Sequence, residues 1–281
     1  MNIGVVGLGL IGGSLAKAYK KKSFTVLAWN RNKVITDFAK MSGDIDGELT
    51  AENLGECDCV FLSITTGGAI DWLAENAGKI PAGVIVMDCC GIKRKVCETG
   101  FRLARENGFT FVGGHPMAGK QVGGFKNSSG DIFEGSVFAI VPEDMNDIGL
   151  LTRIKEILKP AGFTRFAVMT AEEHDEIIAY TSQMTHLVSN AFIKSKTAMS
   201  RNAKVTGGSF RDFTRVAYLD ENMWTELFLE NRDNLIYELE TLMGELERYL
   251  KALKDGDEGE LKDLLAEGKK RKKEVERNAS S

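Results

Sequence analysis

The sequence has few of the residues that mark metal sites, disulfide frameworks and membrane spans. Its five cysteines, at positions 57, 59, 89, 90 and 97, are odd in number and form no paired C-x-x-C spacing, which argues against zinc and disulfide scaffolds. No apolar run reaches the length of a membrane span. The net charge of −4 argues against nucleic-acid binding. We therefore expect a cytoplasmic protein with reduced thiols and no metal, nucleic acid or membrane partner.

In the first part of the chain, short apolar runs alternate with segments of helical spacing. "NIGVVG", "FTVLAW", "CVFLSI", "VIVMD", "TFVGG", "SVFAIVP" and "TRFAVM" read as strands. Apolar strands separated by helices predict a parallel sheet covered on both faces, the α/β Rossmann-type doubly wound class. In such sheets ligands bind beyond the carboxyl ends of the strands.

Beyond about Ala171 the strand pattern stops and helical spacing takes over. Residues 171–196 read as one long helix, and a glycine-rich joint leads to another from about Asn222 to Leu253, which carries an apolar stripe. We place a dinucleotide-binding domain at 1–165 and a helical substrate and dimerisation domain at 166–281. A sustained apolar stripe has to be buried, so it predicts a homodimer through the helical part.

Three glycines between the first strand and the first helix form G-x-G-x-x-G. Glycines at 7, 9 and 12 allow a tight turn and let the backbone approach a pyrophosphate at the helix N-terminus. The strand before and the helix after are the context that this motif requires. We assign the loop to cofactor binding, together with two residues at the end of "CVFLSIT": Gly7, Leu8, Gly9, Leu10, Ile11, Gly12, Ser63 and Thr65.

The residues that close the second strand indicate the type of nicotinamide cofactor. NAD sites usually carry an acidic residue there, but this chain reads "AWNRNK". Asn30 repels neither a ribose nor a phosphate, and Arg31 and Lys33 add positive charge beside it. The segment therefore predicts NADP, with NAD as the alternative.

The chain has only three histidines, and one of them stands in "GGHPMAGKQVGG" at 113–124. The glycines around His115 carry no side chains, so they leave room beside it for a substrate ring and a nicotinamide. An imidazole that titrates near neutral pH suits proton transfer. On the later helix, His186 follows Ser182 by four residues, which puts both on one face. Arg211 and Arg215 are also four apart and suit carboxylate binding or exposed ion pairs.

Several motifs in this order carry a family resemblance: "GLGLIGGSLA", "HPMAG", "HD…SQMTH" and "FRDFTRVA…W". The chain resembles the prephenate/arogenate dehydrogenase family of tyrosine biosynthesis over most of its length. The resemblance implies a Rossmann domain, a helical dimerisation domain, and oxidative decarboxylation of a cyclohexadienyl dicarboxylate.

Individual roles follow from the resemblance. His115 matches the catalytic histidine, which hydrogen-bonds the substrate 4-hydroxyl. Ser182 and His186 match active-site positions, and Arg215 matches an arginine that binds a substrate carboxylate. His174 and Trp224 match motif positions to which we assign only packing or interface roles.

The chain departs from the family pattern at three positions. Gly91 stands where D-x-x-S-x-K has serine, Thr65 where a proline is usual, and Gln121 where some members are acidic. These changes leave the reaction type standing but bear on how the substrate ring is held.

Three alternatives stay open. Arogenate differs from prephenate only in an amino side chain, so an arogenate dehydrogenase fits the same motifs. A β-hydroxyacid dehydrogenase shares the domain plan but does not explain HPMAG. A non-catalytic NADP-binding redox sensor needs only the glycine loop.

Overall fold

The computed structural model describes residues 1–120, 122–200 and 207–280. Its contacts divide the chain into two compact units, Met1–Asn231 and Arg232–Ser281. Gln121, one of the three departures from the family pattern, lies outside the described residues. The division at residue 165, which concerns cofactor and substrate roles, stays a prediction.

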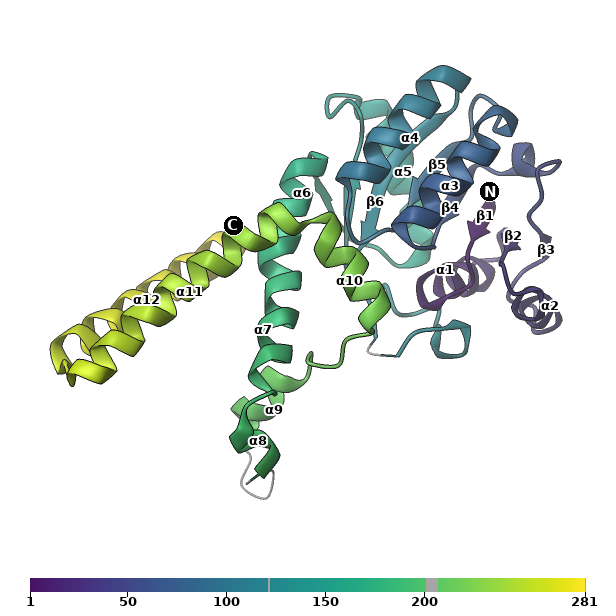
Figure 1. The fold of residues 1–281 in the computed structure, drawn as a ribbon. Coiled ribbons are helices and arrows are strands. Elements are labelled where there is room, and N and C mark those ends of the chain that lie inside the picture. Colours follow the sequence, from purple (N-terminus) through teal and green to yellow (C-terminus); the bar gives the residue numbers. More distant parts are fainter. Residues whose placement is uncertain (121, 201–206, 281) are drawn as a thin grey trace. The chain divides into compact units, whose positions relative to one another are not determined.

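An eight-stranded sheet forms the centre of the first unit, in the order β3-β2-β1-β4-β5-β6-β7-β8 (Figure 1). Its strands are β1 (Asn2–Val6), β2 (Thr25–Trp29), β3 (Gly47–Glu48), β4 (Cys59–Leu62), β5 (Ile85–Asp88), β6 (Thr110–Pro116), β7 (Val137–Val141) and β8 (Arg165–Val168). The Rossmann-type fold class is confirmed. The parallel expectation is wrong at one place, because β7 pairs with β6 in the antiparallel direction, from Gly113 opposite Val141 to Pro116 opposite Phe138.

Helices cover both faces of the sheet. The elements are α1 (Leu10–Lys21), α2 (Lys33–Met41), α3 (Thr66–Asn76), α4 (Arg94–Asn107) and α5 (Ile148–Leu158). Leu15 of α1 and Ile154 of α5 share one buried cluster, whereas Leu73 of α3 and Val96 of α4 belong to the other. Strand residues alternate between the two clusters, which is why these strands read as continuous apolar runs.

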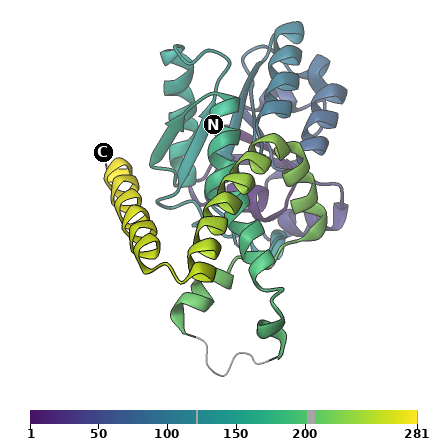
Figure 2. The same cartoon turned by 60° about the vertical axis from the view of Figure 1, so that its left-hand side comes forward.

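A helical region follows β8 within the first unit. It comprises α6 (Ala171–Ile178), the π-helical segment η5 (Ala179–Met184), α7 (Thr185–Phe192), α8 (Lys196–Ser200), α9 (Gly208–Thr214) and α10 (Glu221–Glu230). In Figures 1 and 2, α6 and α7 continue one another as a single rod. The long helix expected at 171–196 is therefore present, but a π-helical turn interrupts its α-helical bonding and it ends at Phe192.

The second unit consists of α11 (Arg232–Asp255) and α12 (Glu258–Ser280), which pack together. The single helix expected from about Asn222 to Leu253 is wrong, since α10 ends at Glu230 and α11 begins at Arg232. The apolar stripe is thus shared between two helices. On α11 its last three members, Leu246, Leu250 and Leu253, are exposed.

Among the described residues, no helix is both long and apolar enough to cross a membrane.

Candidate active site

The glycine loop lies at the carboxyl edge of the sheet, where β1 ends and α1 begins. Gly7 has φ +95°, a conformation that side chains rarely adopt. A Cβ at Gly12 would lie 1.8 Å from the Gly7 carbonyl oxygen, so only glycine fits where the helix approaches the strand. A Cβ at Gly9 would meet nothing within 4 Å. Gly9 also provides no side-chain cap for α1, which leaves the first N–H groups of the helix to a phosphate.

A cavity of about 980 Å³ opens beside this loop. Of the residues predicted for the cofactor, six line it: Gly7, Gly9, Asn30, Arg31, Ser63 and Thr65. Thr65 also caps α3, since its hydroxyl oxygen accepts from Gly68 N at 3.3 Å, and this gives the residue a local role where the family usually has proline. Leu8 is buried, and Leu10, Ile11 and Gly12 form the first turn of α1; these four residues do not line the cavity.

The end of β2 is arranged differently from the sequence expectation. Asn30 Oδ1 accepts from Leu8 N at 2.9 Å, so this side chain ties β2 to the glycine loop. Lys33 Nζ lies 4.0 Å from Glu48 Oε2 and is not among the cavity residues. Arg31 is therefore the cation of this segment that lines the cavity.

The same cavity also brings in carboxylates from distant segments. Glu48 from β3 and Asp71 and Glu75 from α3 line it beside Arg31. The segment "AWNRNK" contains no carboxylate, but the cavity as a whole does. These acidic groups act against a 2′-phosphate.

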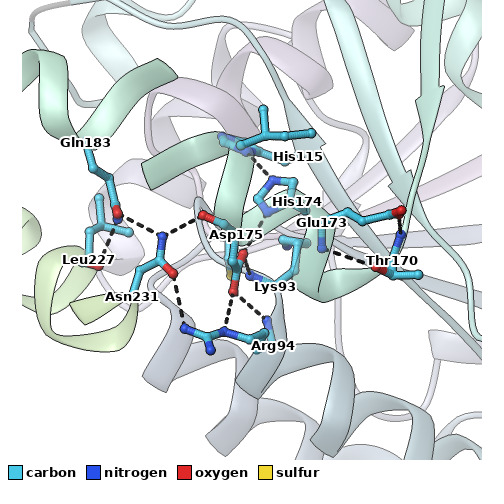
Figure 3. A network of polar contacts seen from close by, with 12 residues as sticks. Lys93, Arg94, His115, Thr170, Glu173, His174, Asp175, Gln183, Leu227 and Asn231 are labelled. Carbon is cyan, nitrogen blue, oxygen red and sulfur yellow. Dashed lines mark hydrogen bonds and ion pairs between the residues drawn. The ribbon is translucent and has the colours of Figure 1, made fainter. Parts of the chain in front are cut away.

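His115 lies near the end of β6 at the same carboxyl edge and joins a hydrogen-bonded chain (Figure 3). Its Nδ1 lies 2.9 Å from Nε2 of His174, and Nδ1 of His174 lies 2.7 Å from Oδ1 of Asp175. His174 is 1% exposed and Asp175 is fully buried. His174, to which the sequence analysis assigned packing or interface roles, is in direct contact with His115.

The partners of Asp175 decide which nitrogen carries each proton. The carboxylate accepts from Lys93 N at 2.8 Å and Arg94 N at 3.0 Å, and Arg94 Nε lies 3.3 Å from it. With these donors around it, the carboxylate acts only as an acceptor. His174 must then donate from Nδ1 and accept at Nε2, so His115 donates from Nδ1. By this network assignment, Nε2 of His115 carries the lone pair of a base.

A buried ion pair holds the backbone just before His115. Lys93 Nζ, with no exposed side-chain surface, pairs with Asp88 and donates to Gly114 O at 2.7 Å. Gly114 N donates back to Asp88 Oδ1 at 3.1 Å. Burial, the largest single influence, lowers the pKa of Lys93, but the Asp88 carboxylate together with Cys90 and Cys97 outweighs it, so the lysine pKa is raised. The pair therefore holds the Lys93 ammonium close enough to His115 to lower the pKa of the imidazole.

Burial and charge together keep His115 neutral. Burial lowers the pKa of His115 well below its usual 6.5, and the nearby His174 and Lys93 lower it further. Burial also lowers the pKa of His174, against the pull of the Asp175 hydrogen bond. Both rings are consequently uncharged at neutral pH, as a proton acceptor must be.

The other predicted substrate residues lie on the helical region. Ser182 is in η5 and His186 in α7, and His186 Nδ1 donates to Ser182 O at 2.8 Å. The His186 ring lies 4.3 Å from the Trp224 ring, between centroids, which agrees with the packing role expected for Trp224. That internal hydrogen bond leaves Nε2 of His186 as the nitrogen that a ligand can meet.

Arg215 immediately follows α9, and two hydrogen bonds hold its neighbourhood against α7. Ser189 Oγ donates to Phe213 O at 2.7 Å, and Asn190 Nδ2 donates to Ala217 O at 3.0 Å. The backbone on both sides of the exposed Arg215 is thereby tied to the helix that carries His186.

Sequence reasoning missed Lys93, Asp175 and Asn231 as parts of this site. Asp175 stood in the quoted "HD" pair, and Lys93 is the lysine of the D-x-x-S-x-K pattern, so both offered a signal. Asn231 offered none. At Gly91, where the family pattern has serine, a Cβ would lie 3.2 Å from Leu227 Cδ2, so a side chain there requires Leu227 to move.

No metal site accompanies these residues. The described part of the chain holds no group of three or more histidine, cysteine, aspartate or glutamate side chains that could bind a metal ion. All five cysteines are free.

Two family models match the chain. Residues 15–166 match "Prephenate dehydrogenase, nucleotide-binding domain", and residues 170–267 match "Prephenate dehydrogenase, dimerization domain".

Individual relatives agree with the models. The chain is 25% identical to a prephenate dehydrogenase of Lactococcus lactis subsp. cremoris over 280 residues, 97% of this chain and 77% of that protein. A crystal structure of Aquifex aeolicus prephenate dehydrogenase with hydroxyphenyl propionate and NAD+ is 28% identical, with TM-score 0.80 and 98% of both chains covered. Synechocystis arogenate dehydrogenase shares the fold, with TM-score 0.82, 23% identity, and coverage of 98% of this chain and 100% of that one.

Proposed function

We propose, since this chain belongs to the prephenate dehydrogenase family, that it catalyses the oxidative decarboxylation of prephenate to 4-hydroxyphenylpyruvate in tyrosine biosynthesis. The observation that carries the proposal is the hydrogen-bonded chain from His115 through His174 to Asp175. This chain makes His115 the proton acceptor that the oxidation requires at the substrate hydroxyl.

The proposed reaction has a simple balance. A nicotinamide dinucleotide held by the glycine loop would supply the acceptor for the hydride that leaves C4 of the substrate. The 4-hydroxyl proton passes to Nε2 of His115 as the oxygen becomes a ketone. The bond to the carboxylate on the opposite ring carbon then breaks, its electron pair makes the ring aromatic, and carbon dioxide leaves. The phenol oxygen takes a proton back, so one prephenate and one oxidised cofactor give 4-hydroxyphenylpyruvate, carbon dioxide and the reduced cofactor.

The partners of His115 prepare it for this step. Hydrogen bonding to His174 holds the ring with Nε2 unprotonated, and Asp175 fixes the proton on the far nitrogen of His174. Once His115 takes the proton, the chain that ends at the Asp175 carboxylate stabilises the imidazolium. The same logic orients histidine in hydrolytic triads. Lys93 opposes premature protonation because its charge lowers the pKa of His115.

Ser182, His186 and Arg215 are proposed to bind the substrate. An exposed guanidinium suits a carboxylate, and prephenate carries two. The fixed tautomer of His186 offers an acceptor nitrogen, which suits a hydroxyl or ammonium donor. The second candidate substrate, arogenate, differs in having such an ammonium group, and the arrangement at His186 is what favours it.

The residues present fit a nicotinamide dinucleotide, whose pyrophosphate the glycine loop and the start of α1 would hold. We keep NADP as the preferred form on the strength of Arg31, which lines the cavity. Lys33 and Asn30 no longer support this preference, and Glu48, Asp71 and Glu75 oppose it. One added charged interaction supplies a preference of roughly tenfold to hundredfold. We expect the preference for NADP over NAD to lie at or below the lower end of this range, so NAD should be accepted as well.

We also propose a cytoplasmic homodimer that uses the helical part, residues 166–281, for association. The exposed leucines of α11 support it, because an apolar stripe of this length is rarely left in water. Light scattering at micromolar concentration tests the oligomeric state, and a monomer would contradict it.

One experiment separates the candidate functions. The purified protein is mixed with NADP or NAD and with prephenate, arogenate or 3-hydroxyisobutyrate, and absorbance of the reduced cofactor is followed. We expect reduction with prephenate and release of carbon dioxide. Reduction of the cofactor with arogenate alone would indicate an arogenate dehydrogenase. Reduction with 3-hydroxyisobutyrate alone would indicate a β-hydroxyacid dehydrogenase, and cofactor binding without reduction would indicate a redox sensor.

A further inference from the structure

A buried asparagine separates α10 from α11. Asn231 is fully buried, and its φ of −116° and ψ of 25° end the α-helical geometry. The leucine spacing on either side favours an unbroken helix, so local sequence preference does not account for the break. Burying a carboxamide costs free energy of folding unless the group is hydrogen-bonded, so the partners of Asn231 have to account for its burial.

Every polar atom of this side chain has a partner (Figure 3). Nδ2 donates to Asp175 O at 2.8 Å and to Gln183 Oε1 at 2.9 Å. Oδ1 accepts from Arg94 Nη2 at 3.1 Å. Gln183, itself 1% exposed, donates from Nε2 to Leu227 O at 2.9 Å. The bonds saturate both donors of Asn231 and link three helices.

These contacts reach both halves of the candidate active site. Asp175 ends the hydrogen-bonded chain that orients His115. Gln183 is the neighbour of Ser182 and lies within η5, the π-helical segment that precedes His186. A π-helical turn inserts extra length into a helix, is rare, and occurs often at functional sites. The π-helical turn changes the direction in which the following side chains point. A contact that holds the turn in place therefore also determines the orientation of Ser182 and His186.

We propose that Asn231 is a positioning residue that fixes the π-helical turn, and with it Ser182 and His186, relative to the His115–His174–Asp175 chain. The inference rests on the proposed function for its kinetic consequence. It does not rest on it for its structural consequence, because the turn is held whether or not prephenate is the substrate.

The kinetic test uses three variants. Asn231→Ala removes all the side-chain hydrogen bonds of Asn231. Asn231→Asp keeps the side-chain volume and the bond from Arg94 but removes the two bonds that Asn231 donates. Gln183→Ala removes the partner of Asn231 in η5. We expect kcat/KM for prephenate to fall on the order of ten- to a hundredfold, as a small misplacement of binding groups costs, while the Kd of the cofactor changes less than twofold. In Asn231→Ala combined with Gln183→Ala the losses should not add, because both act through one contact.

Tyr19→Phe is the matched control. It removes a buried hydrogen bond to a backbone carbonyl, Tyr19 Oη to Ile157 O at 2.8 Å, in the core cluster formed by α1 and α5. This variant should lose thermal stability while keeping kcat/KM. If the Asn231 variants lower Tm as Tyr19→Phe does and leave kcat/KM unchanged, Asn231 is merely structural and the proposal is overturned.

Hydrogen exchange supplies a readout that needs no activity. In Asn231→Ala we expect amides of residues 179–187 to lose protection while those of β1 and β4 keep theirs. Unchanged protection in 179–187 overturns the proposal. If the wild type turns over neither prephenate nor arogenate, the proposed function fails and this measurement still decides the role of Asn231. Should Asn231→Ala not fold, Gln183→Ala carries the same measurement, since it leaves the buried asparagine with Arg94 and Asp175.

Discussion

Nδ1 of His115 lies 2.9 Å from Nε2 of His174, although 59 positions of sequence separate the two residues. β6 carries the first and α6 the second, and Asp175 completes the chain. Since the aspartate only accepts, proton donation runs in one direction, from His115 to His174 to Asp175. This contact therefore determines that Nε2 is the unprotonated nitrogen of His115.

Replacing His115 by Asn should preserve folding and cofactor binding but lower turnover of prephenate. A lost acid–base group typically costs on the order of 10²- to 10⁴-fold in rate. Steady-state kinetics and cofactor titration by fluorescence of the reduced form make the comparison. Turnover within a few-fold of wild type would mean that the proton goes to another group.

The pH dependence of kcat/KM should show an acid limb with a midpoint below 6.5. His115 accepts a proton only when neutral, and burial, together with the nearby His174 and Lys93, lowers its pKa well below that value. Activity is therefore retained as pH falls through 6.5 and is lost only at lower pH. The carboxylates of Asp88 and Asp175 are bonded to Lys93 and His174, and no hydrogen bond joins them to the His115 ring in the described residues. A midpoint at or above 6.5, with cofactor saturating, would contradict this account.

His174→Phe should lower kcat more than it raises the KM for prephenate. The ring volume is roughly kept, but His115 loses the acceptor that sets its tautomer. His174→Gln provides an amide oxygen that can accept from His115 Nδ1, so it should recover part of the loss. The acid limb should also move in the Phe variant, because His174 contributes to the lowered pKa. Equal effects of Phe and Gln on kcat, with an unmoved limb, would leave His174 a packing residue.

Arg215→Ala should mainly raise the KM for substrate. A charge-assisted hydrogen bond contributes about 1.5–3 kcal/mol, which corresponds to roughly ten- to a hundredfold. Arg211→Ala removes the same charge from an exposed position on α9 and serves as the control. If both variants raise the KM to the same extent, the effect comes from the loss of positive charge near α9. Arg215 then makes no specific contact with the substrate.

Cofactor preference should respond in opposite directions to two changes in one cavity. Arg31→Ala removes the cation that lines the cavity and should weaken NADP binding while sparing NAD. Glu48→Gln removes a carboxylate that also lines it and should strengthen NADP binding. Both cofactors are titrated into the wild type and the two variants. If Arg31→Ala leaves the ratio of the two Kd values unchanged, Arg31 does not contact the 2′-phosphate.

The elements of the Rossmann part were largely predictable because their signals are local. Gly7 and Gly12 must be glycines for a backbone reason, and the spacing of the motif itself shows it. The direction of β7 was not predictable, because an apolar strand looks the same whether its neighbour runs parallel or antiparallel. The break at Asn231 also escaped prediction, since its cause is a set of partners on α4, α6 and η5.

The sequence by itself determined the alternation of strands and helices, the phosphate-binding turn, and a histidine on a backbone thinned by glycine. Each of these depends on the chemistry of neighbouring residues. Only the tertiary structure decided that His174 and Asp175 orient His115, that Glu48 shares a cavity with Arg31, and that Asn231 holds the turn beside Ser182. Hydrogen bonds and charges act over a few ångströms of space, and residue spacing does not encode which distant segments the packed core brings within that reach.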